Sequence, residues 1–171
     1  MTYETLINDI NSKYGENAIY IMQNGSVQSE IDFLKRKEDD GETPEYFYRY
    51  AWEHIERIAN NMLTPATVQI GDGVTVNLWS DRHAATVIKK TKFSVTVQYD
   101  KATLDPNFKP EWIPGGFAAH CINQDEQTYT YERDPNGRIE TYRWSNRYGT
   151  YGQPGNLRLS KGRHEFYDYN F

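Results

Sequence analysis

The spacing of apolar residues changes near Thr64-Pro65, and this change constrains the fold more than any other feature of the sequence. Before it, apolar residues recur every three or four positions, as in amphipathic helices. After it they alternate with polar residues, as in strands with one buried face. The length of 171 residues suits one domain or one with an appendage. We therefore predict an α+β fold, with a helical segment at 1–65 and a β-rich domain at 66–171.

The helical segment is expected to contain three helices. The first runs from Glu4 to Lys13, and Gly15 stands where a helix stop belongs. The apolar stretch 18–22 fits either a strand or a helix, because periodicity does not separate the two in so short a run.

The second helix is predicted to begin after Ser26 or Ser29 and to run into the charged stretch 35–40. The third has Thr43 as its N-cap and Pro44 at its first position, and it ends near Leu63. Residues 1–65 carry 12 acidic and 6 basic residues, whereas 66–171 carry 12 and 13. The helical segment therefore holds the surplus acidity of the chain.

The β-rich domain is expected to be a small antiparallel, SH3-like β-barrel or a strongly bent sheet. Alternation indicates two strands, with buried faces formed by Val74, Val76 and Leu78 and by Phe93, Val95, Val97 and Tyr99. A third strand is expected between them at Ala84–Lys90. Prolines and glycines between residues 106 and 116 predict a loop that no regular element crosses.

Turn residues at Asp134-Pro135-Asn136-Gly137 predict a hairpin between two alternating runs. In that hairpin one face is formed by Tyr129, Tyr131, Tyr142 and Trp144. Leu, Ile, Val and Phe together number only 33, while the chain has 14 Tyr and 4 Trp. We therefore expect the core to rely on aromatic rings.

Several classes of protein and site are excluded by composition. No apolar run approaches the roughly 20 residues of a membrane span, and residues 1–5 do not resemble a signal peptide. A lone cysteine, Cys121, and four dispersed histidines predict neither a disulfide framework nor a metal site, and no cofactor motif is present. The net charge of −5 does not favour nucleic acid as a partner.

The main candidate site is the loop between the first two predicted strands. It gathers an aromatic ring, an anion, a fixed cation and a titratable ring, with two later residues at the same end of the barrel completing a cleft. The residues are Trp79, Asp81, Arg82, His83, Tyr99 and Asp100. Such a cleft takes a flat group on its rings and an anion at Arg82; a solvated turn is the alternative interpretation.

Two other surfaces are candidates for binding. The acidic run Glu38, Asp39, Asp40 and Glu42 mimics phosphates in one interpretation and is an ordinary charged helix end in the other. Near the C-terminus, Arg143 and Trp144 suit a phosphate and a base, although core rings with surface arginines are the simpler interpretation.

Three blocks of residues resemble a small protein family of tailed bacteriophages without an assigned activity. The blocks are Gly71–Thr75, Trp79–Ile88 and Val97–Ala102, and the ending Glu165–Phe171 is also similar. The resemblance covers roughly residues 70–171. It implies a phage origin and action in the cytoplasm of the bacterial host, and it carries over no catalytic residue.

From these observations we expect a non-enzymatic binding protein that inhibits a host antiviral defence system. It either blocks a defence protein, as an anti-CRISPR protein blocks its effector, or captures a nucleotide second messenger. A nucleic-acid-binding accessory protein of phage replication or transcription is the alternative. A hydrolase or nuclease acting through Asp81, His83 and Asp100 is a third, weaker hypothesis.

Overall fold

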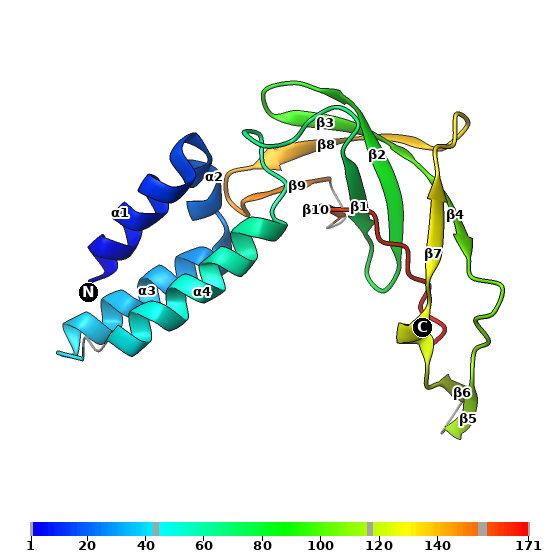
Figure 1. Cartoon of the computed structure of the whole chain (residues 1–171), viewed down its shortest axis with the longest axis horizontal. Helices are drawn as coiled ribbons and strands as arrows, with labels where there is room; N and C mark the ends of the chain where they lie inside the picture. The colour runs from blue at the N-terminus through cyan, green and yellow to red at the C-terminus, as the bar shows by residue number, and fades with distance from the viewer. Residues whose placement is uncertain (1, 43–44, 116–117, 154–156, 171) are drawn as a thin grey trace. The chain divides into compact units, whose positions relative to one another are not determined.

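The structure is a computed structural model that describes residues 2–42, 45–115, 118–153 and 157–170. The chain forms two compact units. Unit 1 contains Met1–Val68 and Trp144–Tyr151, and unit 2 contains Gln69–Arg143 and Gly152–Phe171. Helices precede antiparallel strands along the chain, which confirms the predicted α+β fold (Figure 1).

The described residues of unit 1 form four α-helices, and α3 and α4 run side by side (Figure 1). They are α1 (Tyr3–Tyr14), α2 (Ala18–Met22), α3 (Gly25–Asp39) and α4 (Glu45–Asn61). The three predicted helices are α1, α3 and α4, and the ambiguous stretch 18–22 is helical. Gly15 ends α1 with a φ of 52°, as expected of a glycine at a helix stop.

The start of α3 differs from the prediction. The helix begins at Gly25 and not after Ser26 or Ser29. Its N-cap is Asn24, whose side-chain oxygen accepts hydrogen bonds from the amides of Ser26 and Val27 at 3.0 and 3.4 Å. Asparagine is as good an N-cap as serine, so Asn24, which comes before Ser26 and Ser29 in the chain, sets the start of the helix.

Helix α4 ends at Asn61, close to the predicted end near Leu63. The predicted N-cap Thr43 and first helical residue Pro44 lie outside the described residues. Apolar residues on the facing sides of the helices form one core, made of Leu6, Ile10, Ala18, Ile21, Val27, Ile31, Leu34, Ala51, Ile55 and Ala59. The rings packed against this core are only partly buried, whereas Trp144 and Tyr151, which also belong to unit 1, are buried. The core of unit 1 is therefore mainly aliphatic and relies on aromatic rings less than predicted.

Six strands close a barrel in the spatial order β1-β10-β9-β8-β3-β2, which confirms the predicted barrel. They are β1 (Gly73–Asn77), β2 (Arg82–Lys90), β3 (Ser94–Tyr99), β8 (Ile139–Ser145), β9 (Thr150–Gly152) and β10 (Arg158–Lys161). Buried side chains on these strands are mostly aliphatic, with two tyrosines, and include Val74, Val76, Ala85, Val87, Val95, Val97, Tyr142, Tyr151 and Leu159.

Two residues assigned to the buried faces lie outside them. Leu78 follows the end of β1 and Phe93 precedes β3, and the two are 38% and 47% exposed. The alternation that predicted their burial holds only while the chain remains in the strand, so it fails at these two turns.

The turn at Asp134-Pro135-Asn136-Gly137 forms, but the predicted hairpin does not. The amide of Gly137 donates to the carbonyl of Asp134 at 3.0 Å. β7 (Tyr129–Glu132) pairs with β4 (Lys101–Leu104), whereas β8 pairs with β3. A single residue, Asp100, separates β3 from β4, so these two strands follow each other almost without a break. β7 and β8 pair with them in turn, and the turn at residues 134–137 bulges out between β7 and β8 (Figure 1).

The rings that the hairpin was expected to align are therefore separated. Tyr129 and Tyr131 lie in the β4–β7 ribbon, Tyr142 is buried in the barrel, and Trp144 belongs to unit 1. The turn residues predicted a local reversal correctly, but they do not select which strand each arm pairs with.

The loop predicted between residues 106 and 116 contains a strand. β5 (Trp112–Gly115) pairs with β6 (Ala118–Cys121) in a two-stranded ribbon, with Pro114 opposite Ala119. Proline lacks an amide hydrogen but is tolerated in an edge strand, and both strands of a two-stranded ribbon are edges. The expectation that no regular element crosses this segment is therefore wrong.

Candidate functional site

The loop between β1 and β2 presents Trp79 to solvent with 86% of its surface exposed. The loop is closed by a hydrogen bond of 2.9 Å from the Leu78 amide to the carbonyl of Asp81. The Asp81 side chain accepts a further bond of 2.9 Å from the amide of Asp168. The indole therefore projects from a loop that its own backbone and the C-terminal segment hold in place.

Arg82 begins β2 and is tied to the same C-terminal segment. Its amide and carbonyl exchange two hydrogen bonds of 3.0 Å with Phe166. Its guanidinium lies 5.3 Å from the centre of the Phe166 ring and 3.4 Å from Nε2 of His164. Arg82, the predicted cation, follows Trp79 closely in the sequence. It is exposed, and its guanidinium lies over an aromatic ring.

A polar cluster occupies one end of the barrel, and we call it the barrel-end cluster: His83, Tyr99, Glu140, Tyr142 and Glu165. Glu140 accepts hydrogen bonds from the hydroxyls of Tyr99 (2.9 Å) and Tyr142 (2.6 Å). His83 pairs through Nδ1 with Glu165 at 2.9 Å, and its ring lies 5.8 Å from that of Tyr99. The cluster satisfies its own hydrogen bonds, which favours a structural role.

The pKa values of the cluster follow from these contacts. Burial is the main cause that raises the pKa of Tyr99 to about 12, so its hydroxyl remains protonated at neutral pH. The hydrogen bond to Glu165 raises the pKa of His83 above its ordinary value, and burial opposes this rise. The imidazolium is therefore the form that the fold favours.

This shift predicts that the free energy of unfolding depends on pH through His83. A histidine with a raised folded pKa stabilises the fold fully below its unfolded pKa of about 6.5, and this stabilisation is lost as pH rises through the folded value. We expect His83→Gln to lower the free energy of unfolding more at pH near 6 than at pH near 9, measured by urea denaturation. Equal losses at both pH values would refute the pairing.

Asp100 lies on the outer side of the barrel wall, away from His83. Its side chain is 1% exposed and accepts hydrogen bonds from the Thr86 hydroxyl and from Nε of Arg163, both at 2.7 Å. Arg133 approaches its other oxygen at 3.4 Å. The carboxylate is thus held by two arginines and does not line a cleft with Tyr99.

The hydrolase hypothesis required Asp81, His83 and Asp100 to converge. His83 faces the barrel interior, as does Val76, its partner across the strands. Asp100 instead binds Thr86 on the outer face. The wall of the barrel therefore separates two of the three side chains, and the contacts described do not form a catalytic triad.

The neighbours Arg143 and Trp144 point to opposite sides of β8, because side chains alternate along a strand. Arg143 is exposed, whereas Trp144 is 8% exposed and donates from Nε1 to the side chain of Gln23 at 2.9 Å. The Trp144 ring packs edge-on against Tyr20 and Tyr151. Trp144 is therefore a core residue of unit 1 and is not available to stack on a ligand.

The acidic run of unit 1 is partly engaged in the fold. Glu38 accepts a hydrogen bond of 3.3 Å from the Tyr3 amide at the start of α1, and Glu42 pairs with Lys37 at 3.0 Å. Asp39 and Asp40 are exposed at the end of α3. Two of the four predicted residues thus have structural partners, which favours the interpretation as a charged helix end.

The sequence did not indicate Glu140, Glu165 or Arg163, each of which binds a predicted residue. Of these three residues, only Glu140 could have been found from the sequence, since it lies two residues before Tyr142 and therefore shares its face of the strand. Glu165 and Arg163 come from a segment distant in sequence, and only the tertiary structure brings them to His83 and Asp100.

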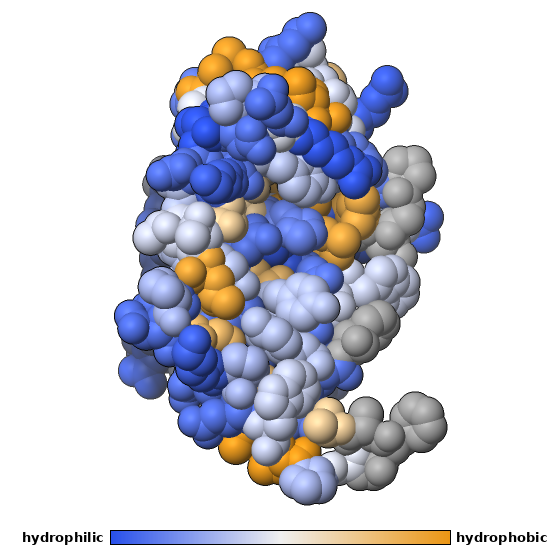
Figure 2. All heavy atoms as spheres, turned by 90° about the vertical axis from the view of Figure 1, so that its right-hand side faces the viewer, coloured by the Kyte–Doolittle hydropathy of each residue, from blue (hydrophilic) through white to orange (hydrophobic). Residues whose placement is uncertain are grey.

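Exposed apolar residues also gather on the β5–β6 ribbon. Trp112, Ile113 and Ile122 are 48%, 45% and 53% exposed. Figure 2 shows apolar side chains at its lower end, where this ribbon lies. The Trp112 ring packs edge-on against Tyr169, with ring centres 6.0 Å apart, and Trp112 and Ile113 point to opposite sides of the strand, so these residues do not form one uncovered patch.

Within the described ranges, no three His, Cys, Asp or Glu side chains gather as metal ligands. Cys121 is buried, and its amide donates to the side chain of Asn170 at 2.7 Å. None of the described helices is long and apolar enough to cross a membrane. Comparison with known proteins adds no assignment, because no family model, no curated protein and no solved structure matches the chain.

Proposed function

We propose that this chain is a non-enzymatic binding protein that inhibits a host antiviral defence system by docking onto a defence protein through Trp79. The observation that carries the proposal is the 86% exposure of that indole. Tryptophan and arginine are the residue types most enriched among those that dominate protein interfaces. Trp79 and Arg82 supply both types from one loop.

The order of the loop supports this role. Asp81 is fixed by the Asp168 amide and Arg82 by Phe166, so the loop that carries Trp79 is held before a partner arrives. A surface that is already ordered loses little conformational entropy on binding, which increases affinity. The comparisons give no positive indication of enzymatic activity.

Blocking of a protein is favoured over capture of a nucleotide signal. The cleft expected for a nucleotide needed Tyr99 and Asp100 beside Trp79. The Tyr99 hydroxyl binds Glu140 in the barrel end, and Asp100 is held by Arg163 on the outer wall. A projecting indole fits a depression in a partner better than it encloses a small ligand. The phage setting is supported by the sequence resemblance over residues 70–171.

The test is the plating of phage on cells that carry a defined defence system, with this protein expressed. We expect the wild-type protein to raise plating and Trp79→Ala to abolish the gain. Loss of the indole should weaken binding to the purified defence complex by about thirtyfold, equivalent to about 2 kcal/mol. Tyr46→Ala removes another exposed ring, 60% exposed in unit 1, and should remain active.

Three results would contradict the proposal. They are no gain in plating with the wild-type protein, full activity of Trp79→Ala, and tight binding of cyclic nucleotides to the purified protein without binding to any defence complex. The last result would replace protein blocking with signal capture.

A further inference from the structure

Three strands of the barrel share an outer face that is polar and basic. Thr96 of β3 lies opposite Lys89 of β2 on one side and opposite Thr141 of β8 on the other. The hydroxyls of the two threonines are 2.9 Å apart and exposed. One pair further along, Arg143 lies opposite Ser94. Directly opposed residues of neighbouring strands project on the same side, so these side chains form one surface.

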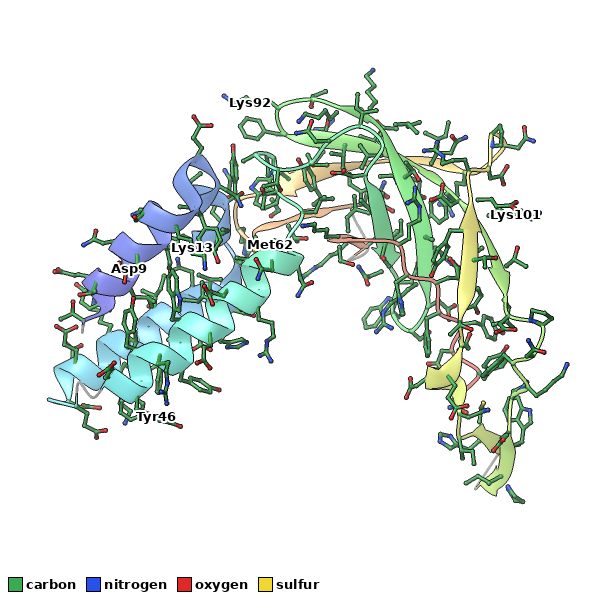
Figure 3. All side chains as sticks on the ribbon, viewed as in Figure 1. Asp9, Lys13, Tyr46, Met62, Lys92 and Lys101 are labelled. Carbon is green, nitrogen blue, oxygen red and sulfur yellow. The ribbon has the colours of Figure 1, made fainter. Side chains whose placement is uncertain are left out.

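The β2–β3 turn lies at the end of two of these strands and carries Lys92 and Phe93. Figure 3 shows Lys92 at the tip of this turn. Its ammonium lies 5.2 Å from the centre of the Phe93 ring, and that ring is 47% exposed. We call the surface formed by Lys89, Lys92, Phe93, Thr96, Thr141 and Arg143 the basic face.

The charge of the basic face is opposite in sign to that of the chain. Lys89, Lys92 and Arg143 are exposed and form no ion pair with any residue that the structure describes. The acid at the far end of the same strands, Asp100, is buried beneath Arg133 and Arg163. The other acid of these strands, Glu140, points inward and is 9% exposed.

The net charge of −5 conceals this surface, because the excess of acidic over basic residues lies in residues 1–65. Binding of a polyanion depends on the local arrangement of cations and not on the total charge of the chain. The net charge of the chain therefore does not exclude nucleic acid as a ligand of the basic face.

We infer that the basic face binds single-stranded nucleic acid. Lysine and arginine neutralise backbone phosphates, the threonine hydroxyls donate hydrogen bonds to phosphate oxygens, and Phe93 offers a ring on which an unstacked base can lie. A duplex keeps its bases stacked and offers no ring for Phe93. The site is separate from the Trp79 loop, so it goes beyond the proposed function and does not depend on it.

The experiment measures binding of a fluorescently labelled oligodeoxythymidine to the full chain by anisotropy, over a series of salt concentrations. The charge variant is Lys89→Gln, Lys92→Gln and Arg143→Gln combined, and the ring variant is Phe93→Ala. Lys101→Gln is the matched control, since Lys101 is a 65% exposed lysine of unit 2 on the separate β4–β7 ribbon (Figure 3). Circular dichroism checks that each variant is folded.

We expect the wild type to bind with an affinity that falls with salt. Removing three phosphate contacts should reduce the slope of log affinity against log salt by about 2, since each contact contributes about 0.7 on a single strand. Phe93→Ala should weaken binding at least about fivefold with the slope unchanged. Lys101→Gln should bind as the wild type does.

The inference is overturned if the wild type does not bind at low salt, or if the folded charge variant keeps the wild-type slope. It is also overturned if duplex DNA of the same length binds more tightly than the single strand, or if anionic phospholipid vesicles bind and the oligonucleotide does not. Each result is independent of Trp79→Ala, whose failure would affect only the proposed function.

Discussion

Replacing Trp144 with alanine is expected to lower the free energy of unfolding by about 3–5 kcal/mol, the usual cost of deleting a buried large ring. The ring is 8% exposed and packs edge-on against Tyr20 and Tyr151. Its Nε1 also donates to Gln23, 121 positions earlier in the sequence. The substitution thus removes the ring, the hydrogen bond and a link between α2 and a segment that is distant in sequence.

The measurement is urea denaturation followed by the helical circular dichroism signal. Trp144→Phe is the matched control, because it keeps most of the ring but loses the hydrogen bond, and it should cost only about 1 kcal/mol. If Trp144→Ala were as stable as the wild type, the assignment of Trp144 to the core of unit 1 would be wrong. An exposed ligand-stacking tryptophan would give that result.

The second large effect is expected for Gly137→Ala, at about 3 kcal/mol of lost stability. A Cβ at this position would lie 2.0 Å from the carbonyl oxygen of Tyr99, so the backbone of the turn or of β3 must move. That movement would disturb the hydrogen bond of 2.9 Å from the Tyr99 amide to the carbonyl of Arg138. Glycine is required here by the close approach of two backbone segments.

Gly25→Ala provides the control, since a Cβ at Gly25 meets nothing within 4 Å and the residue lies at the start of α3. It should leave stability unchanged or raise it slightly, because alanine favours the helix. Thermal denaturation of both variants compares the two positions directly. Equal melting temperatures would show that the bulged turn does not pack on β3 as described.

Much of the local structure was predictable from residue types. Gly15 stops α1 because glycine tolerates a positive φ, and the alternation of valines in β1 and β3 located two strands. The start of α3 was predicted at least two residues too late, since both Asn24 and Ser26 are good capping residues and the sequence does not choose between them.

The candidate site was predictable only in part. Trp79, Arg82 and His83 could be grouped because they are near in sequence and lie between two recognisable strands. Glu165 and Arg163, which bind His83 and Asp100, could not, because the contacts span 82 and 63 positions. Charge summed over the chain also hid the basic face, since it mixes acids of unit 1 with bases of the barrel.

The sequence by itself determined the order of helices and strands and the α+β class, because the spacing of apolar residues is a local property. Only the tertiary structure decided which strands pair and which rings are buried. The Asp134–Gly137 turn shows the reason: its hydrogen bonds are local, but the partners of β7 and β8 lie about 25 or more positions away along the chain, in β4 and β3. That choice separated Trp144 from Tyr129 and Tyr131 and placed it in the core of unit 1.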